Sequence, residues 1–557
     1  MNNIPPAGDA TSGDHRWLLG AGGVALGLCA VPYLVAAVLG PVDFERGGTF
    51  WYDLDVSQYQ AAMREASRGA SWLVHDHFTA EPHAPALMFT LYVALGKLAA
   101  VTGLAAPALF GALEWVSRIV LLLALYVFAA TFLPNRAERH LAIVLAAGTL
   151  GLVGFFLPLA ALFQQLGGDA LFGALPTALA LTPELSTFVV LLVAPHIALG
   201  LACTLLCAPV YLRAQEGQPR WLLALAGLIV ALSLLHPFNL PILASVLVAD
   251  CALRSRARGA WPSRCEWAVV AVLLVAVAPV AIYYGLLFHV DPFWSGTYGG
   301  AQNETPTPPP WGLPMGFGLV LLAAPAAWPA VRSWPTDRRR LLLLWVGLGL
   351  LAMYAPVTYQ RRFGLGVQPG LAVLAAVGLR AVTSWMRTRR WGPVRRRLGH
   401  YGLVLAAAGT SVFIYVSLIA SAALNAPIDL YPWSRAEADA GRWLAAHSAP
   451  DDVVLASTPF ANPLVGVIDG RVVHGHGVAT WDSPTKDALV ARFFARDAAI
   501  GERSALLRRS AATVIGFGPR ERALGATSLA DQPELRLVYD QGGVAWYRVR
   551  AGHDAVW

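Results

Sequence analysis

The sequence predicts an all-α membrane domain with about 11–13 transmembrane helices, followed by a small soluble α/β domain. Hydrophobic residues make up 56% of the 557 residues and charged residues only 13%, against about a quarter charged in an ordinary soluble protein. The mean hydropathy is +0.54, and only the C-terminal part alternates helical and strand patterns. This composition excludes a soluble globular enzyme, a disordered chain and a disulfide scaffold.

Long uncharged runs supply the predicted spans. A helix needs about 20 apolar residues to cross about 30 Å of hydrocarbon. Runs of this length without Asp, Glu, Lys or Arg lie between Arg16 and Asp43, His140 and Asp169, Glu304 and Arg332, Arg340 and Arg361, and His400 and Asp429. The run from Arg220 to Asp250 carries two prolines within residues 234–241, which favours two helical segments over one.

Four arginine-bearing loops orient the chain: 213–220, 254–264, 332–340 and 387–397. Cytoplasmic loops are enriched in Arg and Lys, so these loops are predicted inside and residues 430–557 outside. Basic and acidic residues balance in 430–557, so the net charge of +7 belongs entirely to residues 1–429. The charge is therefore an orientation signal, and no nucleic-acid partner is expected. Only Lys97 and Lys486 are Lys among 41 basic residues, which is typical of a GC-rich bacterial genome. Together with the apolar runs, this predicts a location in a bacterial plasma membrane.

Residues 1–429 are thus predicted to form the membrane domain, with an extracytoplasmic first loop at 43–84 and an outer loop at 289–311. Loops of such length are commonly functional. Residues 430–557 form the predicted α/β domain. Its expected elements are helices at 436–447, 483–495 and 502–510, strands at 452–457, 471–475 and 512–517, and a hairpin at 535–549 about Gly542 and Gly543.

The first loop carries acids directly after the first span, among them Asp53 and Asp55. Asp55 precedes an amphipathic segment, 56–69, suited to lying flat on the membrane. A carboxylate there can act as a general base at the bilayer surface. The alternative is that Asp55 only caps the following helix.

A dense group of potential metal ligands, His75, Asp76, His77 and His83, follows in the same loop. Imidazole and carboxylate groups suit a divalent cation. The spacing in His-Asp-His does not put two ligands on one helix face, so a metal site here needs a folded loop.

Several polar residues fall within or beside the apolar runs. Glu114 and Arg118 are four residues apart and can pair on one helix face, either as a functional intramembrane pair or as a structural brace. Glu184 follows Thr182 and Pro183, which is typical of a helix start. His196 and His236 adjoin prolines, where each either takes part in a site or satisfies a carbonyl at a kink.

Arg361 and Arg362 lie together at the outer end of a span. Two guanidinium groups can bind a phosphate bidentately, and anchoring to lipid head groups is the alternative. The chain contains no Walker A, GxGxxG, HExxH or GxSxG motif, so nucleotide-driven transport, dinucleotide chemistry and serine hydrolysis lose their usual signals.

These features together resemble the GT-C superfamily of multispanning glycosyltransferases, in particular its protein-mannosyltransferase and aminoarabinose-transferase branches. The resemblance lies in a first span, an Asp-x-x-x-Tyr step, a Gly-x-Trp-like step and a Pro-rich entry to the second span. The matching residues are Asp55, Tyr59, Gly69, Trp72, Pro82 and Pro85. The Lys-Pro-Pro of the family is replaced here by Glu81-Pro82-His83.

The resemblance implies transfer of a sugar from a polyprenyl-phosphate donor to an extracytoplasmic acceptor, with inversion. Asp55, ranked above Asp53, would be the base, and Arg361 or Arg362 would hold the donor phosphate. The group of His75, Asp76, His77 and His83 would hold a divalent cation. The expected substrate pocket comprises Tyr59, Glu184, His196, His236, Glu114 and Arg118. A transporter or flippase of lipid-linked glycans and a catalytically inactive GT-C-like scaffold remain as alternatives.

Overall fold

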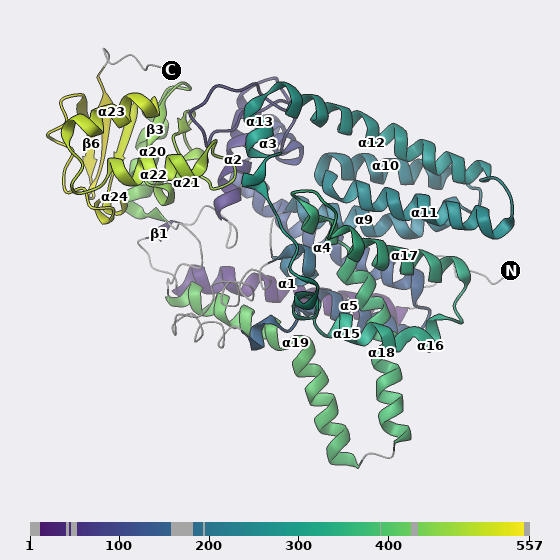
Figure 1. The fold of residues 1–557 in the computed structure, drawn as a ribbon. Helices are drawn as coiled ribbons and strands as arrows, with labels where there is room; N and C mark the ends of the chain where they lie inside the picture. Colours follow the sequence, from purple (N-terminus) through teal and green to yellow (C-terminus); the bar gives the residue numbers. More distant parts are fainter. Residues whose placement is uncertain are drawn as a thin grey trace. The chain divides into compact units, whose positions relative to one another are not determined.

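The computed structural model describes residues 12–39, 44–45, 53–156, 182–192, 195–389, 392–424 and 433–550. The described chain divides into two compact units (Figure 1). The first unit comprises Met1–Val38, Glu114–Ala281 and Thr305–Ala422, and the second comprises Leu39–Leu113, Ile282–Glu304 and Ala423–Trp557. The second unit therefore joins the C-terminal part of the chain to the first loop and the outer loop.

The first unit is helical. Its longer helices are α1 (Ser12–Leu39), most of α4 (Ala106–Phe132), α5 (Arg136–Gly148), α9 (Pro195–Ala214), α10 (Pro219–Leu235), α11 (Leu240–Arg258), most of α12 (Arg264–Val290), α17 (Thr336–Ala352), α18 (Val367–Thr388) and α19 (Pro393–Leu424). Its short helices are η1 (Val153–Phe155), η2 (Pro183–Leu185), α8 (Thr187–Val190), η3 (Pro237–Asn239), η5 (Pro310–Gly312), α14 (Leu313–Phe317), α15 (Leu319–Ala323), η6 (Ala324–Ala327), α16 (Trp328–Val331) and η7 (Gln360–Gly364).

Within the described residues, seven helices are long and apolar enough to cross a membrane, or eight if the bent pair Pro310–Phe317 and Leu319–Val331 is one span. Thr90–Thr102 and Pro219–Leu235 are shorter apolar helices. The predicted run at 140–169 lies partly outside the described residues. The fold class is confirmed as a multi-pass helical membrane domain with a small α/β part, and the exact number of spans stays a prediction.

The predicted break at 234–241 is confirmed. α10 ends at Leu235, the 3-10 turn η3 follows, and α11 begins at Leu240. Proline cannot donate the backbone hydrogen bond that a continuous helix needs, so Pro237 and Pro241 each sit at the start of a new helical segment.

The central helix of the first unit is α18. Every residue from Val367 to Leu379 is buried, because α18 packs against α5, α15, η6 and α17. Close approach depends on a small residue: a Cβ on Gly378 would overlap the carbonyl oxygen of Ala323. Beyond this buried stretch, α18 and α19 project as a hairpin (Figure 1).

Two of the arginine-bearing loops that the sequence places on the same side of the membrane meet at a buried aspartate. The Asp250 carboxylate accepts hydrogen bonds from Arg254 at 2.8 Å, Arg340 at 2.5 Å and Tyr211 at 2.7 Å. A fully buried carboxylate is stable only when it is paired and hydrogen-bonded. The Asp250 cluster therefore ties together the ends of α9, α11 and α17.

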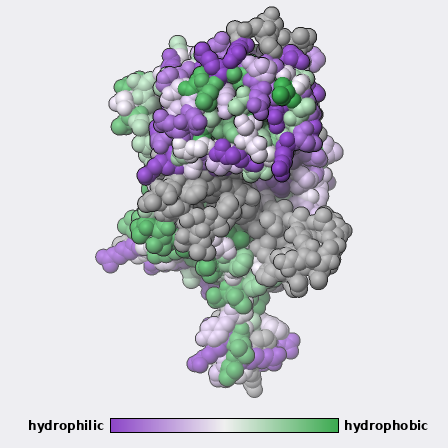
Figure 2. Space-filling model, turned by 90° about the vertical axis from the view of Figure 1, so that its left-hand side faces the viewer, coloured by the Kyte–Doolittle hydropathy of each residue, from purple (hydrophilic) through white to green (hydrophobic). Residues whose placement is uncertain are grey.

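In the second unit, a five-stranded sheet has the order β4-β3-β5-β7-β6. Its strands are β3 (Val453–Leu455), β4 (Arg471–Val472), β5 (Val514–Phe517), β6 (Leu535–Gln541) and β7 (Val544–Val549). β4, β3 and β5 pair in parallel, whereas β7 is antiparallel to β5 and β6. Hydrophilic side chains gather over this part of the molecule on the face shown in Figure 2, as expected of a surface in water.

The remaining elements of the second unit are β1 (Phe44–Glu45), α2 (Asp53–Arg68), α3 (Thr90–Thr102), α13 (Pro292–Thr297), η4 (Ala301–Asn303), β2 (Trp433–Ser434), α20 (Arg435–His447), α21 (Thr458–Val465), α22 (Ser483–Phe493), α23 (Ile500–Ser510) and α24 (Pro519–Ala523). Every helix and strand predicted in 436–549 is present at its expected place.

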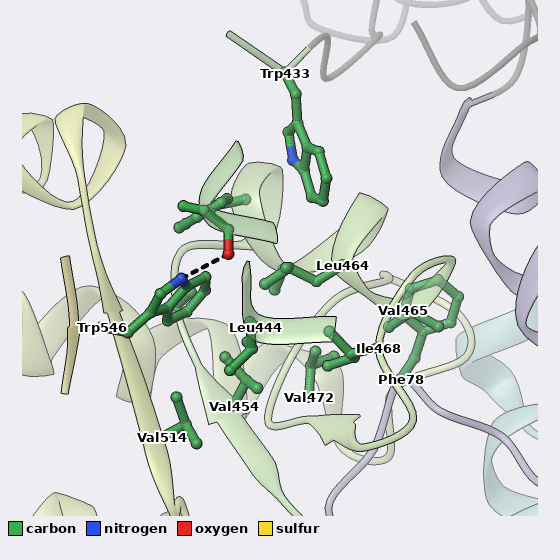
Figure 3. Packing of buried hydrophobic residues seen from close by; sticks show 14 of the residues in the cluster. Phe78, Trp433, Leu444, Val454, Leu464, Val465, Ile468, Val472, Val514 and Trp546 are labelled. Atoms are coloured by element: carbon green, nitrogen blue, oxygen red, sulfur yellow. Dashed lines mark hydrogen bonds between the residues drawn. The ribbon is translucent and has the colours of Figure 1, made fainter. Parts of the chain in front are cut away.

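An apolar cluster on one side of the sheet forms a core of this unit (Figure 3). Trp546 lies within it and donates from Nε1 to the carbonyl oxygen of Ala440 at 2.9 Å, which satisfies the polar atom of a buried tryptophan. Phe78 from the first loop and Ala61 from α2 belong to the same cluster. The first loop is therefore part of the core and not an appendage.

The prediction that the amphipathic segment 56–69 lies on the membrane is wrong for the folded protein. α2 packs its apolar face against α3 and α21, and Ser57 donates to Asn462 Oδ1 at 3.1 Å. An amphipathic pattern shows that one helix face is covered, but not whether lipid or protein covers it.

Candidate functional site

Asp55 lies in the first turn of α2, two residues after the helix begins at Asp53. Its Oδ1 lies 3.0 Å from Nε2 of His476, which follows β4 in the C-terminal part of the chain. The Asp55 side chain is 37% exposed and that of His476 is 11% exposed. Asp55 is therefore a carboxylate that solvent can reach and that a nearly buried imidazole holds from one side. The side chain of Asp53 lies outside the described residues.

A buried network next to this pair centres on Asp76, whose side chain is fully covered. Asp76 accepts hydrogen bonds from Tyr298 Oη at 2.5 Å, Gln58 Nε2 at 3.0 Å and the backbone N–H of Phe78 at 2.8 Å. Burial raises the pKa of Asp76, and burial together with Asp76 raises the pKa of Tyr298. The network links α2, the first loop and the outer loop.

His75 and His77 both face the carboxylate of Glu65. His75 Nδ1 lies 2.8 Å from Glu65 Oε1, and His77 Nε2 lies 3.2 Å from Glu65 Oε2. The other ring nitrogen of His77 lies 3.1 Å from the carbonyl oxygen of Gly470. Burial acts to raise the pKa of Glu65, but the hydrogen bonds from His75 and His77 outweigh it and lower the pKa to about 2.

The tautomer of His83 follows from its contacts. The backbone N–H of Asp76 donates to Nε2 at 2.9 Å, while Nδ1 lies 3.0 Å from the carbonyl oxygen of Glu81. An atom that accepts from an N–H carries no proton, so Nδ1 holds the proton and donates to Glu81. Burial lowers the pKa of His83 to about 4, which keeps the ring neutral.

The structure does not assemble the predicted metal site from His75, Asp76, His77 and His83. Each of the four side chains contacts a different set of protein atoms. Among the residues that the structure describes, no group of three or more His, Cys, Asp or Glu side chains is arranged to hold a metal ion. Adjacent residues in an irregular loop point to different neighbours, and sequence proximity alone does not make their ligating atoms converge.

Five of the predicted residues lie in one polar cluster of the first unit: Glu184, His196, His236, Arg361 and Arg362. This cluster forms where η7 lies against η2 and η3. Glu184 Oε2 lies 3.5 Å from Arg361 Nε. Arg362 lies over the ring of Phe238, with Cζ 4.3 Å from the centroid. The rings of His196 and His236 are stacked at 6.3 Å.

In this cluster Arg361 pairs with the Glu184 carboxylate, while Arg362 lies against the ring of Phe238. The Glu184 Oε2 and Arg361 Nε atoms are buried and form an ion pair with each other at 3.5 Å, although neither makes a hydrogen bond within the described residues. Buried polar atoms normally have partners, and exceptions call for an explanation such as a missing ligand. A guanidinium group such as that of Arg361 can bind an anion.

The predicted pair of Glu114 and Arg118 is formed, with a distance of 3.7 Å between Glu114 Oε1 and Arg118 Nη2. Tyr33 of α1 donates to Glu114 at 3.3 Å, and Arg118 Nε donates to the carbonyl oxygen of Leu191 at 2.8 Å. These contacts connect α1, α4 and the segment after α8, as a structural brace would.

Tyr59, predicted in the substrate pocket, is buried. Its ring stacks on Tyr92 of α3 with the centroids 4.1 Å apart. The ring therefore packs α2 against α3.

Sequence reasoning missed three residues that contact Asp55 or Asp76: His476 and Tyr298 come from distant segments, and Gln58 comes from α2. A usable signal exists for His476, which stands between Gly475 and Gly477 directly after a predicted strand. Polar residues at strand ends in glycine-containing loops are common in functional sites.

No protein-family model and no curated protein matches this sequence. Solved structures with a similar fold do match it. The cryo-EM structure of the arabinofuranosyltransferase AftD from Mycobacteria, as mutant R1389S, gives a TM-score of 0.55 at 16% identity, covering 97% of this chain and 42% of that one. A second structure of AftD gives 0.51 at 16% identity, covering 97% and 40%. The chain thus spans less than half of the AftD chain.

The crystal structure of ArnT from Cupriavidus metallidurans, bound to undecaprenyl phosphate, gives a lower TM-score of 0.48 at 14% identity, covering 97% of this chain and 99% of that one. The TM-scores of the AftD structures exceed 0.5 and show that the chain shares their fold. The chain has a GT-C fold, as the resemblance implied.

Proposed function

We propose that the protein is an integral membrane glycosyltransferase that moves a sugar from a polyprenyl-phosphate donor to an acceptor outside the cytoplasm, with inversion. The observation that carries the proposal is the placement of Asp55: in a fold shared with an arabinofuranosyltransferase, it is a partly exposed carboxylate fixed by His476. The same fold can serve several functions, so the assignment depends on this site.

Asp55 acts as the general base. It removes the proton from the attacking acceptor group as that group bonds to the anomeric carbon. Because the bond to the lipid phosphate breaks at the same time, the leaving group departs as a phosphate anion and needs no strong general acid. Preorganised positive charge then stabilises the transition state.

The Arg361 cluster is the proposed phosphate site. Arg361 Nε is buried, makes no hydrogen bond within the described residues and lies 3.5 Å from Glu184 Oε2, and Arg362 follows it in η7. Guanidinium groups match phosphate geometry.

The proposed location is a bacterial plasma membrane, with the C-terminal α/β part outside the cytoplasm. The arginine-bearing loops support this orientation, and the meeting of Arg254 and Arg340 at Asp250 supports placing their two loops on one side.

The test uses the purified protein in lipid nanodiscs with a panel of radiolabelled undecaprenyl-phosphate sugars, measuring release of undecaprenyl phosphate. We expect Asp55→Asn to lower turnover by about 10²–10⁴-fold while still binding undecaprenyl phosphate. Arg361→Gln should weaken that binding. Asp497→Asn, an exposed acid paired with Arg492, is the matched control and should behave as wild type.

Normal turnover by Asp55→Asn would contradict the proposed mechanism. If the wild-type protein moves a labelled lipid-linked glycan across vesicle membranes without cleaving it, the flippase alternative is correct instead. Absence of both cleavage and movement across the panel, with intact lipid binding, would favour an inactive scaffold.

A further inference from the structure

The contacts of His476 determine where its proton lies. The Nδ1 atom accepts hydrogen bonds from the backbone N–H groups of Val478 at 3.0 Å and Ala479 at 3.1 Å. Because Nδ1 is an acceptor, the proton of the neutral ring resides on Nε2. His476 therefore donates from Nε2 to Oδ1 of Asp55 at 3.0 Å.

The loop that carries His476 is held in place from two other segments. Thr480 Oγ1 accepts from the backbone N–H groups of Gly475 and His476 at 3.2 and 3.1 Å, and donates to the carbonyl oxygen of Phe78 at 2.8 Å. Gln302 of the outer loop donates to the carbonyl oxygens of Val478 and Thr480 at 2.6 and 2.5 Å. The imidazole is thus fixed in both tautomer and position.

We infer that His476 is a positioning residue, which orients the Asp55 carboxylate and keeps it ionised for its role as the base. This inference rests on the proposed function. A hydrogen bond donated to the charged form of a carboxylate favours that form.

The C-terminal part of the chain thus supplies a positioning residue to the proposed site. Among the described residues, other titratable groups near the pair are Asp76 and His474, which interact electrostatically with His476, and Tyr298, which interacts with Asp55.

His476→Asn is the informative variant. The Asn Oδ1 occupies nearly the position of the His Nδ1 and can accept from Val478 and Ala479, so the turn is preserved, whereas the shorter side chain does not reach Asp55. His476→Gln is the rescue variant, because its longer side chain carries an N–H donor toward Asp55. His447→Asn is the control, since His447 is exposed on α20 and stacks on Trp443.

The assay is the pH dependence of undecaprenyl-phosphate release with the donor that the wild-type protein cleaves. We expect His476→Asn to lower kcat about ten- to hundredfold, to move the acid limb of the profile upward by about one pH unit, and to leave KM for the donor unchanged. His476→Gln should restore part of both changes. Thermal unfolding should be the same in the wild-type, His476→Asn and His447→Asn proteins.

If His476→Asn keeps the wild-type pH profile and kcat while Asp55→Asn is inactive, the inference is overturned and the proposed function stands. Full activity of Asp55→Asn overturns both. The inference is also overturned if His476→Asn loses activity only together with a lowered unfolding temperature and the acid limb of the remaining activity does not shift. The role of His476 is then structural.

Discussion

Replacing Asp76 with Ala tests whether the buried network holds the second unit together. Asp76 receives three hydrogen bonds, from Tyr298, Gln58 and the backbone of Phe78. In Asp76→Ala, Gln58 keeps a partner, because its Nε2 also donates to Tyr298 Oη. The Tyr298 hydroxyl and the Phe78 N–H are left without an acceptor.

Each buried donor without a partner costs about 1–3 kcal/mol, so two donors cost about 2–6 kcal/mol. Removing a fully buried carboxylate also removes its desolvation cost, which offsets part of this loss. We therefore expect Asp76→Ala to lower the free energy of unfolding by about 2–3 kcal/mol, which for a unit of this size lowers Tm by roughly 5–10 °C.

Thermal unfolding is monitored by intrinsic tryptophan fluorescence, since Trp294 is buried near the network and contacts the Tyr298 ring. Asp291→Ala is the matched control. Asp291 also connects the first and outer loops, accepting from the backbone of Ala84 and Phe293, but it is partly exposed, so about 1 kcal/mol is expected. Equal losses in the two variants would refute the reasoning from burial.

Two further perturbations test other parts of the structure. Gly378→Ala should destabilise the first unit, because a Cβ there meets the carbonyl oxygen of Ala323. Gly347→Ala is the control and should not destabilise it, because the space around Gly347 is open. The unfolding temperatures of the two variants check this, and equal temperatures would contradict the close packing of α18. The pKa of Glu65 is lowered from its ordinary 4.5 to about 2, so its contribution to stability is present above about pH 4.5 and is lost as the pH falls toward 2. In Glu65→Gln the loss of stability between pH 7 and pH 3 should therefore be smaller than in the wild type, and an unchanged pH dependence would argue against the Glu65 contacts with His75 and His77.

The elements predicted correctly are those with local causes. The helix α20 starts at a capping box in which Ser434 and Glu437 bond each other's backbone, and these two residues stand three apart in the sequence. The turn of the last hairpin places Gly542 at φ 61° and Gly543 at φ 76°, a conformation that two successive glycines favour. The break between α10 and α11 depends on nearby prolines.

The parts that escaped prediction depend on partners far along the chain. α21 carries prolines at its second and sixth positions, so its sequence resembles a loop, and its packing against α2 stabilises it as a helix. His476 and Asp55 are 421 residues apart. The ligand-rich stretch His75–His77 suggested a metal because composition shows which ligating atoms are present, but not where the loop directs them.

The burial of α2 by the C-terminal part of the chain also sets an order of events during synthesis. Ser57 and its partner Asn462 are 405 residues apart, which at about 5–20 residues per second corresponds to a delay of roughly 20–80 s. Throughout that delay the newly made α2 lacks its contacts with the C-terminal segment. An amphipathic helix in that situation binds a bilayer surface, so we expect the nascent α2 to rest on the membrane until the C-terminal segment reaches it.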